Sequence, residues 1–400
     1  MVAKLSNHHR VYLDEASDAP LLDEVKAELL RWTDAVGDPA RPYAEGLEAR
    51  RAIERARTEV AELLGIAPRN ITFCSSATEG LNWLVYAAGL TGSALVVSKV
   101  EHSAVTNTAR KLASELDLIL VEVGVDSSGQ VIPDSLEDAM AEAASKAYGG
   151  RPSRASIFCF IQHANHELGT LQPLPELVEV ARRYGGRIIS DAAQTAGRVP
   201  IDFKRLGVVA LVVSAHKFGG PKGAAAVALA PGFRPRPLLY GAAQERGRRA
   251  GTEDVAALSA FGVACRSVAE DLEKEAQRQR RITEYLAQET IRALPGTRVL
   301  GHPTQRVPHI ISLELSGVQG EAVVLALDKQ GFAVHSGSAC AAEAFEPSPI
   351  LAAVGADSRR NLRISIGRST EPRDIDNFVS ALRVEVGRLQ ALSKDHGASS

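Results

Sequence analysis

The sequence predicts an α/β fold with a mostly parallel central sheet in a large domain, joined to a smaller α+β domain. Between residues 70 and 231, short apolar runs alternate with helix-like segments, which is typical of a parallel sheet covered by helices on both faces. After Asp254 the alternation gives way to a long amphipathic helical stretch, and then to a shorter mixture of strands and helices. With 400 residues the chain is long enough for both domains.

The individual elements follow from the apolar runs and their periodicity. The strands expected in the large domain are residues 70–74, 94–98, 118–123, 155–161, 187–190, 210–214 and 225–229. The helices expected between them include residues 79–89, 104–116 and 174–184. In the small domain we expect a helical stretch at 255–294 with at most one break, strands at 310–315 and 362–366, a helix at 321–330 and a closing helix from residue 371. We expect residues 20–262 to form the large domain, and residues 1–19 with 263–400 the small one.

Composition argues against several classes of function. The 46 basic residues balance 48 acidic ones, which argues against a dominant surface for nucleic acid or for an acidic membrane. The chain has no long apolar stretch and no signal-peptide pattern, so we expect a cytoplasmic protein without membrane or nucleic-acid partners. We expect no metal site. Cys74, Cys159 and Cys265 lie in apolar surroundings typical of an inert core, whereas Cys340 lies among small residues.

Two polar residues stand at the carboxyl ends of predicted strands. Lys217 closes the stretch that follows the apolar run 209–213, and Asp191 follows the run 187–190. In open α/β sheets, ligands bind beyond the carboxyl ends of the strands. A lysine there can form a Schiff base, and an acid can keep a pyridinium nitrogen protonated. This pair is what the chemistry of pyridoxal 5'-phosphate (PLP) requires.

Three further strand ends carry side chains that suit PLP. Thr78 opens a helix whose free N–H groups favour a phosphate, although a simple N-cap explains this segment as well. His102 suits stacking on a planar cofactor and proton transfer, or is a buried, satisfied histidine. Asn165 suits a hydrogen bond to a ring oxygen, or is a turn residue. Each signal is weak alone, but five strand ends that each suit one part of PLP together predict that cofactor.

Several motifs lie along nearly the whole chain: Tyr12-Leu13-Asp14, Ser76-Ala77-Thr78-Glu79, Glu101-His102, Asn165-x-Glu167-x-Gly169, Asp191-Ala192-x-Gln194, Ser214-x-His216-Lys217, Gln244-Glu245-Arg246-Gly247-x-Arg249-x-Gly251-Thr252, Ser336-Gly337-Ser338-Ala339-Cys340 and Arg363-x-Ser365-x-Gly367-Arg368. In residues and in order these motifs resemble cysteine desulfurases of the NifS/IscS type, which are class V, fold-type I PLP enzymes. The 23 positions from Cys340 to Arg363 also resemble this type rather than the shorter-looped SufS group. The resemblance implies PLP fold type I.

The resemblance also implies how the cofactor is held. Lys217 would carry PLP as a Schiff base, Asp191 would pair with the ring nitrogen, and His102 would stack on the ring and assist proton transfer. The other residues implied to contact PLP are Ala77, Thr78, Asn165, Gln194, Ser214, His216 and Thr252. Thr252 would reach the phosphate in the neighbouring subunit, which implies a homodimer with shared active sites.

The implied reaction moves sulfur out of L-cysteine. Arg363 would pair with the substrate carboxylate, and Asn165 would lie near the substrate. The Cys340 thiolate would take the substrate sulfur as a persulfide, leave L-alanine, and pass the sulfur to an acceptor protein. That sulfur would supply iron–sulfur clusters, thiolated tRNA or a sulfur-containing metabolite. The alternative for Cys340 is a buried small residue, but its flanking residues favour a loop.

The chain departs from the family pattern at a few positions. His166 stands where the family usually has a second asparagine, and residues around Asp38 and Tyr43 also differ. These positions concern the substrate side and the dimer edge. Two other functions stay open: another class V enzyme, such as a selenocysteine lyase, epimerase or aminotransferase, and a PLP-fold scaffold without turnover. Cys340 argues against the first, and the intact lysine and aspartate pair argues against the second.

Overall fold

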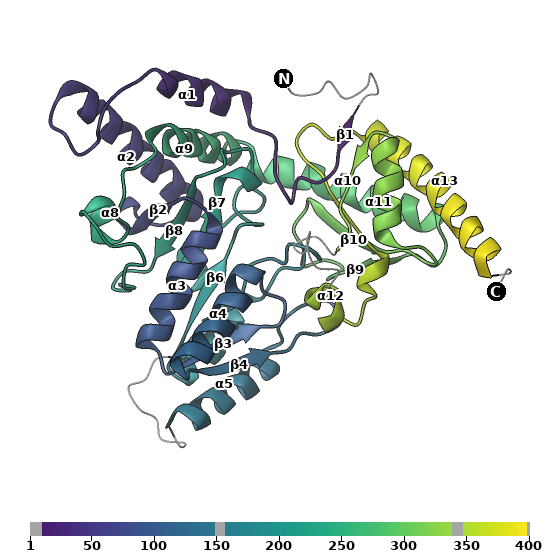
Figure 1. Cartoon of the computed structure of the whole chain (residues 1–400), viewed down its shortest axis with the longest axis horizontal. Coiled ribbons are helices and arrows are strands. Elements are labelled where there is room, and N and C mark those ends of the chain that lie inside the picture. The colour runs from purple at the N-terminus through teal and green to yellow at the C-terminus, as the bar shows by residue number, and fades with distance from the viewer. Residues whose placement is uncertain (1–9, 149–156, 338–346, 398–400) are drawn as a thin grey trace.

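A seven-stranded sheet forms the centre of the larger part of the molecule (Figure 1). The computed structural model describes residues 10–148, 157–337 and 347–397. The strand order is β2 (Ile71–Cys74), β8 (Ala225–Leu229), β7 (Ala210–Ser214), β6 (Gly186–Asp191), β5 (Ile157–Phe160), β3 (Ala94–Ser98) and β4 (Ile119–Val123). The strands from β7 to β4 run parallel, and β8 is antiparallel to both of its neighbours. The predicted mostly parallel sheet is therefore confirmed.

Helices cover both faces of this sheet, and each face has its own hydrophobic core. One face carries α3 (Ala77–Thr91) and α4 (Ser103–Leu116). The other carries α2 (Ala44–Leu64), α5 (Pro133–Tyr148), α6 (Leu174–Arg183), α7 (Phe203–Leu206) and α9 (Val255–Ala269), with α1 (Asp23–Thr33) packed on α9. Successive residues of β3 alternate between the two cores, because side chains of a strand point to opposite faces. The strands thus read as continuous apolar runs in the sequence.

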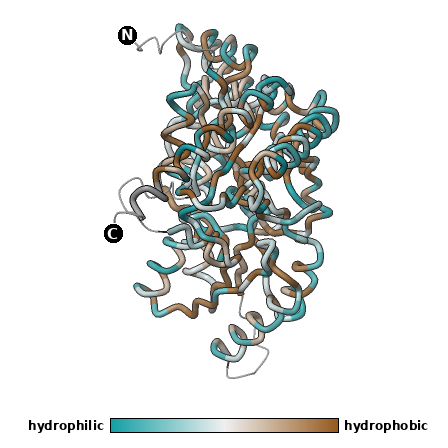
Figure 2. The backbone as a smooth tube through the Cα atoms, turned by 90° about the vertical axis from the view of Figure 1, so that its right-hand side faces the viewer, coloured by the Kyte–Doolittle hydropathy of each residue, from teal (hydrophilic) through white to brown (hydrophobic). Residues whose placement is uncertain are grey.

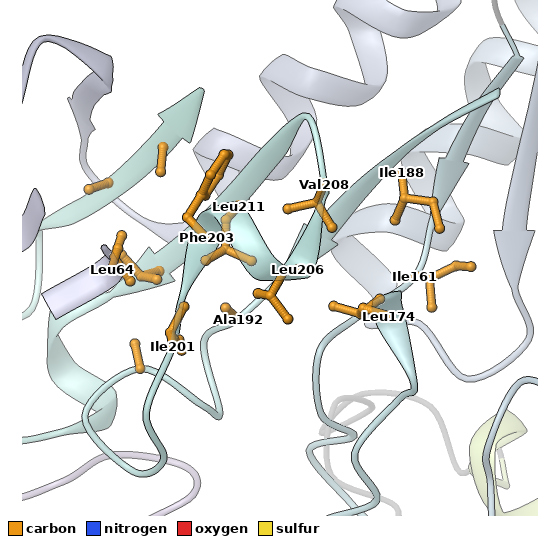
Figure 3. Close-up of a cluster of buried hydrophobic side chains, with 14 of the residues drawn as sticks. Leu64, Ile161, Leu174, Ile188, Ala192, Ile201, Phe203, Leu206, Val208 and Leu211 are labelled. Carbon is orange, nitrogen blue, oxygen red and sulfur yellow. The ribbon is translucent and has the colours of Figure 1, made fainter. Parts of the chain in front are cut away.

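Apolar side chains pack beneath the two strands that lead to the predicted site. Figure 3 shows Phe203 and Leu206 of α7 beside Leu211 of β7, with Ile188 of β6 in the same cluster. Burial of side chains of this size stabilises the fold by about 1.5–3 kcal/mol each. The carboxyl ends of β6 and β7 are consequently held in fixed positions relative to each other.

A second part of the chain packs around a three-stranded antiparallel sheet, and it lies beside the first part in Figure 1. Its strands are β9 (Arg298–Leu300), β10 (Ile310–Glu314) and β12 (Asn361–Ser365), and its helices are α10 (Leu272–Ala293), α11 (Gly320–Lys329), α12 (Pro349–Ala353) and α13 (Pro372–Gly397). The short strands β1 (Val11–Tyr12) and β11 (Phe332–Ala333) pair in parallel. The predicted helical stretch at 255–294 is broken once, between α9 and α10.

The segment after β1 connects the two parts. Leu13 N donates to Ala333 O at 2.9 Å, and Glu15 N donates to Ser365 O at 3.2 Å, both in the second part. A few residues later, Ala19 N donates to His216 O at 2.9 Å in the first part. Residues 13–19 therefore run along the boundary between the two sheets.

Three of the four cysteines belong to the core, as predicted. Cys74, Cys159 and Cys265 are free and buried, and burial raises the pKa of each thiol. A thiol held protonated is a poor nucleophile, because the thiolate is the reactive form. Cys340 lies outside the described residues.

The helices are amphipathic rather than uniformly apolar. Figure 2 shows hydrophilic and hydrophobic stretches alternating along their coils, as expected where one face meets a core. Within the three described ranges, no helix combines the length and the apolar character needed to cross a membrane. The same residues contain no cluster of three or more His, Cys, Asp or Glu side chains suited to a metal ion.

Candidate active site

A cavity of about 310 Å³ opens at the carboxyl ends of β6 and β7. Nine of the residues predicted from the sequence line it: Ala77, Thr78, His102, Asp191, Gln194, Ser214, His216, Lys217 and Arg363. The first eight come from the seven-stranded part, whereas Arg363 lies on β12 of the other sheet. Ala16 and Ser17 of the connecting segment and His335 complete the side nearest the second part. The site is therefore assembled from both parts of the chain.

Lys217 ends a 3-10 turn (Ala215–Lys217) directly after β7. Its Nζ donates to the carbonyl oxygens of Ala16 and Ser17, both at 2.8 Å. Burial, together with the positive charge of Arg363, lowers the pKa of Lys217. A lowered pKa favours the neutral amine, which is the form that reacts with an aldehyde.

Asp191 ends β6, beside β7. Its Oδ1 accepts a hydrogen bond from Ala193 N at 2.8 Å, and its Oδ2 accepts none from the described residues. Burial raises the pKa of this carboxyl, although the hydrogen bond from Ala193 N opposes the shift. A cationic N–H in the cavity would therefore find an acceptor oxygen that lacks a partner.

His102 caps the N-terminus of α4. Its Nδ1 accepts a hydrogen bond from Ala104 N at 3.0 Å, and burial lowers its pKa. The ring is thus neutral, and because Nδ1 is an acceptor the proton sits on Nε2. The ring of His166 lies edge-on to it, with centroids 5.1 Å apart. His166, the departure from the family pattern, consequently lines the cavity as well.

The N-terminus of α3 forms another wall. Ser76 Oγ accepts a hydrogen bond from Glu79 N at 3.1 Å, which fixes the first turn. Ala77 and Thr78 of that turn line the cavity. Unpaired N–H groups and the positive end of the helix dipole suit an anion such as a phosphate.

Ser214 and His216 lie beside this wall at the end of β7. Ser214 Oγ and His216 Nδ1 are 2.9 Å apart and form a hydrogen bond. Burial lowers the pKa of His216 to about 4, so the ring is neutral at physiological pH. The pair offers hydrogen bonds rather than charge.

Arg363 is the one guanidinium that the structure places against this cavity within the described ranges. Its Nη1 donates to His166 O at 2.8 Å, and its Nη2 donates to Asp14 Oδ1 at 2.8 Å and to Ser17 Oγ at 2.7 Å. Its Nε is buried and has no hydrogen-bond partner. Only 5% of the side chain is exposed.

Two predicted ligands do not lie in the cavity. Asn165 is buried and does not line the cavity: its Nδ2 donates to Val100 O at 3.1 Å, and its Oδ1 accepts from Glu167 N and Leu168 N at 2.8 Å. These bonds are those of a turn residue, which was the alternative interpretation of Asn165. Its contact with the ring and the substrate stays a prediction. Thr252 is exposed and also lies outside the cavity.

The structure adds cavity residues for which the sequence predicted no role. His335 lines the cavity, and its backbone pairs with that of Arg363. Burial lowers the pKa of His335 to about 4. Glu167 also lines the cavity, accepts a hydrogen bond from Ser348 Oγ at 2.7 Å, and has a pKa raised by burial to about 7. An isolated histidine carries no sequence signal, because its place depends on how β12 meets the chain after β11.

A nearby histidine gives a testable pH effect. His163 is buried, its Nδ1 lies 3.0 Å from Thr195 Oγ1, and burial lowers its pKa to about 4. In the unfolded chain His163 takes up a proton near pH 6.5, whereas in the folded protein it does so only near pH 4. The contribution of His163 to stability is therefore full above pH 6.5 and is lost as pH falls towards about 4. The difference in unfolding free energy between wild type and His163→Gln should therefore shrink in this window, by at most about 1.4 kcal/mol per pH unit.

Urea unfolding of both proteins at a series of pH values measures this difference. The other titrating groups are common to the two proteins, so their effects cancel in the comparison. A difference that stays constant between pH 6.5 and about 4 would contradict the lowered pKa of His163.

Comparison with known proteins decides the family. The sequence profile described as aminotransferase class-V matches residues 11–378. The chain belongs to the class-V aminotransferase family. A relative of this class-V chain, named cysteine desulfurase IscS, from Dictyoglomus turgidum, is 32% identical over 391 residues, which is 96% of each protein.

Solved structures agree with the class-V assignment. The NifS-like protein of Rickettsia africae superposes with a TM-score of 0.84 at 26% identity, over 95% of this chain and 100% of that chain. A structure described as SspA in complex with cysteine superposes with a TM-score of 0.75 at 26% identity, over 90% of this chain and 99% of that one. The predicted PLP fold type I is confirmed, and PLP is the cofactor of this class-V protein.

The cavity residues fit PLP. The cavity volume suits a small cofactor. Lys217 places an amine of lowered pKa at one side, and Asp191 offers an unpartnered carboxylate oxygen. The start of α3 with Ser214 supplies neutral donors for a phosphate. These groups match the aldehyde, the ring nitrogen and the phosphate of the cofactor.

Proposed function

We propose that this protein is a PLP-dependent cysteine desulfurase that converts L-cysteine to L-alanine and transfers the sulfur to Cys340. One observation carries the proposal: a single cavity brings the PLP-type set Lys217, Asp191 and His102 together with Arg363 from the second sheet. The names of the class-V relatives support it, since the Dictyoglomus turgidum protein is named a cysteine desulfurase.

The residues of the first part hold and tune the cofactor. Lys217 Nζ would attach the cofactor, and the Asp191 carboxylate would keep the ring nitrogen protonated. His102 would lie against the ring, and its neutral form would offer Nε2–H as a proton donor. When bound, PLP supplies an electron sink for the bonds of the substrate. The lowered pKa of Lys217 favours its neutral amine, which is the form that can take a proton.

Arg363 recognises the carboxylate of an amino-acid substrate, and Cys340 reacts with its sulfur. The guanidinium of Arg363 binds the substrate carboxylate. The Cys340 thiolate attacks the substrate sulfur: a sulfur–sulfur bond forms, the carbon–sulfur bond breaks, and a proton adds to that carbon to give alanine. L-cysteine and the enzyme thiol thus become L-alanine and an enzyme persulfide, with no external oxidant.

The finer parts of the proposal concern partners and place. We propose a homodimer in which Thr252 reaches the cofactor of the neighbouring subunit, and the exposure of Thr252 supports this role. The persulfide passes to a sulfur-acceptor protein that serves iron–sulfur cluster assembly. We also propose that the protein acts in the cytoplasm.

The expected division into residues 20–262 and residues 1–19 with 263–400 is likewise a proposal. Separate hydrophobic clusters support two domains, since one spans Val25 to Val268 and another combines Val11 and Leu13 with residues 282–386. Cys265 and Val268 of α9 pack in the first cluster. This packing favours a boundary after α9 rather than at residue 262.

A turnover assay tests the function. Holoenzyme incubated with L-cysteine and a thiol reductant should release alanine and sulfide in equal amounts. Selenocysteine and other amino acids, run in parallel, measure substrate preference. Formation of pyruvate with ammonia, or transfer of the amino group to a keto acid, would instead show another class-V reaction. If no product formed, the protein would be a scaffold without turnover.

A further inference from the structure

We propose that Asp14 is an internal competitor of the substrate carboxylate. In the resting enzyme it holds the guanidinium of Arg363, and the substrate must displace it to bind. This inference rests on the proposed function, because it takes Arg363 as the group that recognises the carboxylate.

The hydrogen bonds of Arg363 leave no complete edge for a substrate. Nη2 gives its two N–H groups to Asp14 Oδ1 at 2.8 Å and to Ser17 Oγ at 2.7 Å. A guanidinium binds a carboxylate through two parallel N–H groups, either on Nε and Nη2 or on Nη1 and Nη2. Both edges include Nη2, so bidentate binding requires at least one of these two bonds to open. The buried, unpartnered Nε of Arg363 shares its edge with Nη2, whose two N–H groups Asp14 and Ser17 occupy.

Charge points to Asp14 as the group that exchanges. The Arg363 side chain is 5% exposed, and a guanidinium buried to this degree needs a counter-ion. Asp14 supplies that charge in the resting state, and a substrate carboxylate supplies the same charge when it replaces Asp14. If both stayed, two carboxylates would share one guanidinium and repel each other.

Asp14 can leave without moving the chain. The backbone on either side is anchored: Ser365 N donates to Leu13 O at 2.8 Å, and Glu15 N donates to Ser365 O at 3.2 Å. The Asp14 side chain is 18% exposed, against 5% for Arg363. Rotation of this one side chain therefore frees one N–H group of Nη2 and carries the carboxylate towards water.

The segment that carries Asp14 also occupies the amine side of the cavity. Lys217 Nζ donates to the carbonyl oxygens of Ala16 and Ser17, two and three residues further along. Residues 14–17 thus present a carboxylate to Arg363 and neutral acceptors to Lys217. An amino acid that entered the cavity would therefore compete with this segment for Arg363 through its carboxylate.

Steady-state kinetics of Asp14→Asn test the proposal. The substitution keeps the side-chain shape but removes the competing charge, so the KM for L-cysteine should fall by about tenfold. The kcat should stay within about twofold, because the change acts on ground-state binding. Asp18→Asn is the matched control: Asp18 lies in the same segment but pairs with the exposed Lys222 at 2.8 Å, and its KM should equal that of wild type.

A second variant covers the case in which Asp14→Asn fails to fold. Ser17→Ala removes only the hydroxyl acceptor on Nη2 and leaves the ion pair of Asp14 and Arg363 intact. Its KM should fall in the same direction by a smaller factor. A KM that is unchanged or raised in the folded variants would overturn the proposal, since Asp14 would then orient Arg363 rather than compete for it.

A binding measurement separates this inference from the proposed reaction. 3-Mercaptopropionate keeps the carboxylate and lacks the amine, whereas cysteamine lacks the carboxylate. At equal concentrations, 3-mercaptopropionate should raise the melting temperature of Asp14→Asn holoenzyme more than that of wild type, and cysteamine should show no such difference. Equal shifts with 3-mercaptopropionate would overturn the competitor role. Failure of wild type to form alanine would refute only the reaction, because this comparison needs no turnover.

Discussion

Replacing Lys217 by alanine is expected to abolish the visible absorbance of the lysine-linked cofactor and to reduce turnover by about three orders of magnitude or more. The reason is chemical: Lys217 provides the one amine whose pKa the site lowers among the described cavity residues, so its removal takes away both the attachment point and a proton carrier. Absorbance spectra and alanine release measure the two effects.

Lys222→Ala serves as the control for this substitution. Lys222 lies five residues further along, is exposed, and pairs with Asp18 at 2.8 Å. Its removal should leave colour and turnover unchanged. A Lys217→Ala protein that kept the absorbance band and the activity would refute the attachment site.

Replacing Cys340 by alanine is expected to separate the cofactor from sulfur transfer. The variant should keep the absorbance of wild type, because none of the cofactor ligands is changed. Release of alanine and sulfide from L-cysteine should fall by orders of magnitude, since the group that accepts the sulfur is gone. Spectra and product assays on the same preparation provide both readouts.

Cys265→Ala is the matched control for the cysteine. Its thiol is buried in the core, and burial raises its pKa, so its loss affects packing rather than sulfur chemistry. Turnover should survive in this variant. Full turnover in Cys340→Ala would show that another group accepts the sulfur.

The apolar pattern predicted the large sheet well because its strands are buried on both faces. Runs such as Ala94–Ser98 and Ala210–Ser214 then stand out from their surroundings. An apolar run does not indicate the direction of its strand: β8 is as apolar as β7 but antiparallel to it. The two-residue strands β1 and β11 carry no periodicity, so their pairing emerges only from the fold.

In the candidate site, too, some features could be predicted from the sequence and others depend on the fold. Asp191 and Lys217 were predictable because parallel strands bring their carboxyl ends to one edge. His335 and the bonds of Asp14 were not, because they depend on how the second sheet meets the first. For Asn165 the sequence left two interpretations open, because an asparagine after a strand has the same sequence signal whether it binds a ligand or closes a turn; its hydrogen bonds in the structure are those of a turn residue.

A single-turnover experiment tests the central claim most directly. Holoenzyme is mixed with L-cysteine without reductant, and both alanine and protein-bound sulfur are then quantified by mass spectrometry of the digested protein. The proposal predicts one alanine for each sulfur atom added, with the added sulfur on the peptide that contains Cys340. Alanine without added sulfur on that peptide, or added sulfur on Cys74, Cys159 or Cys265 instead, would contradict it.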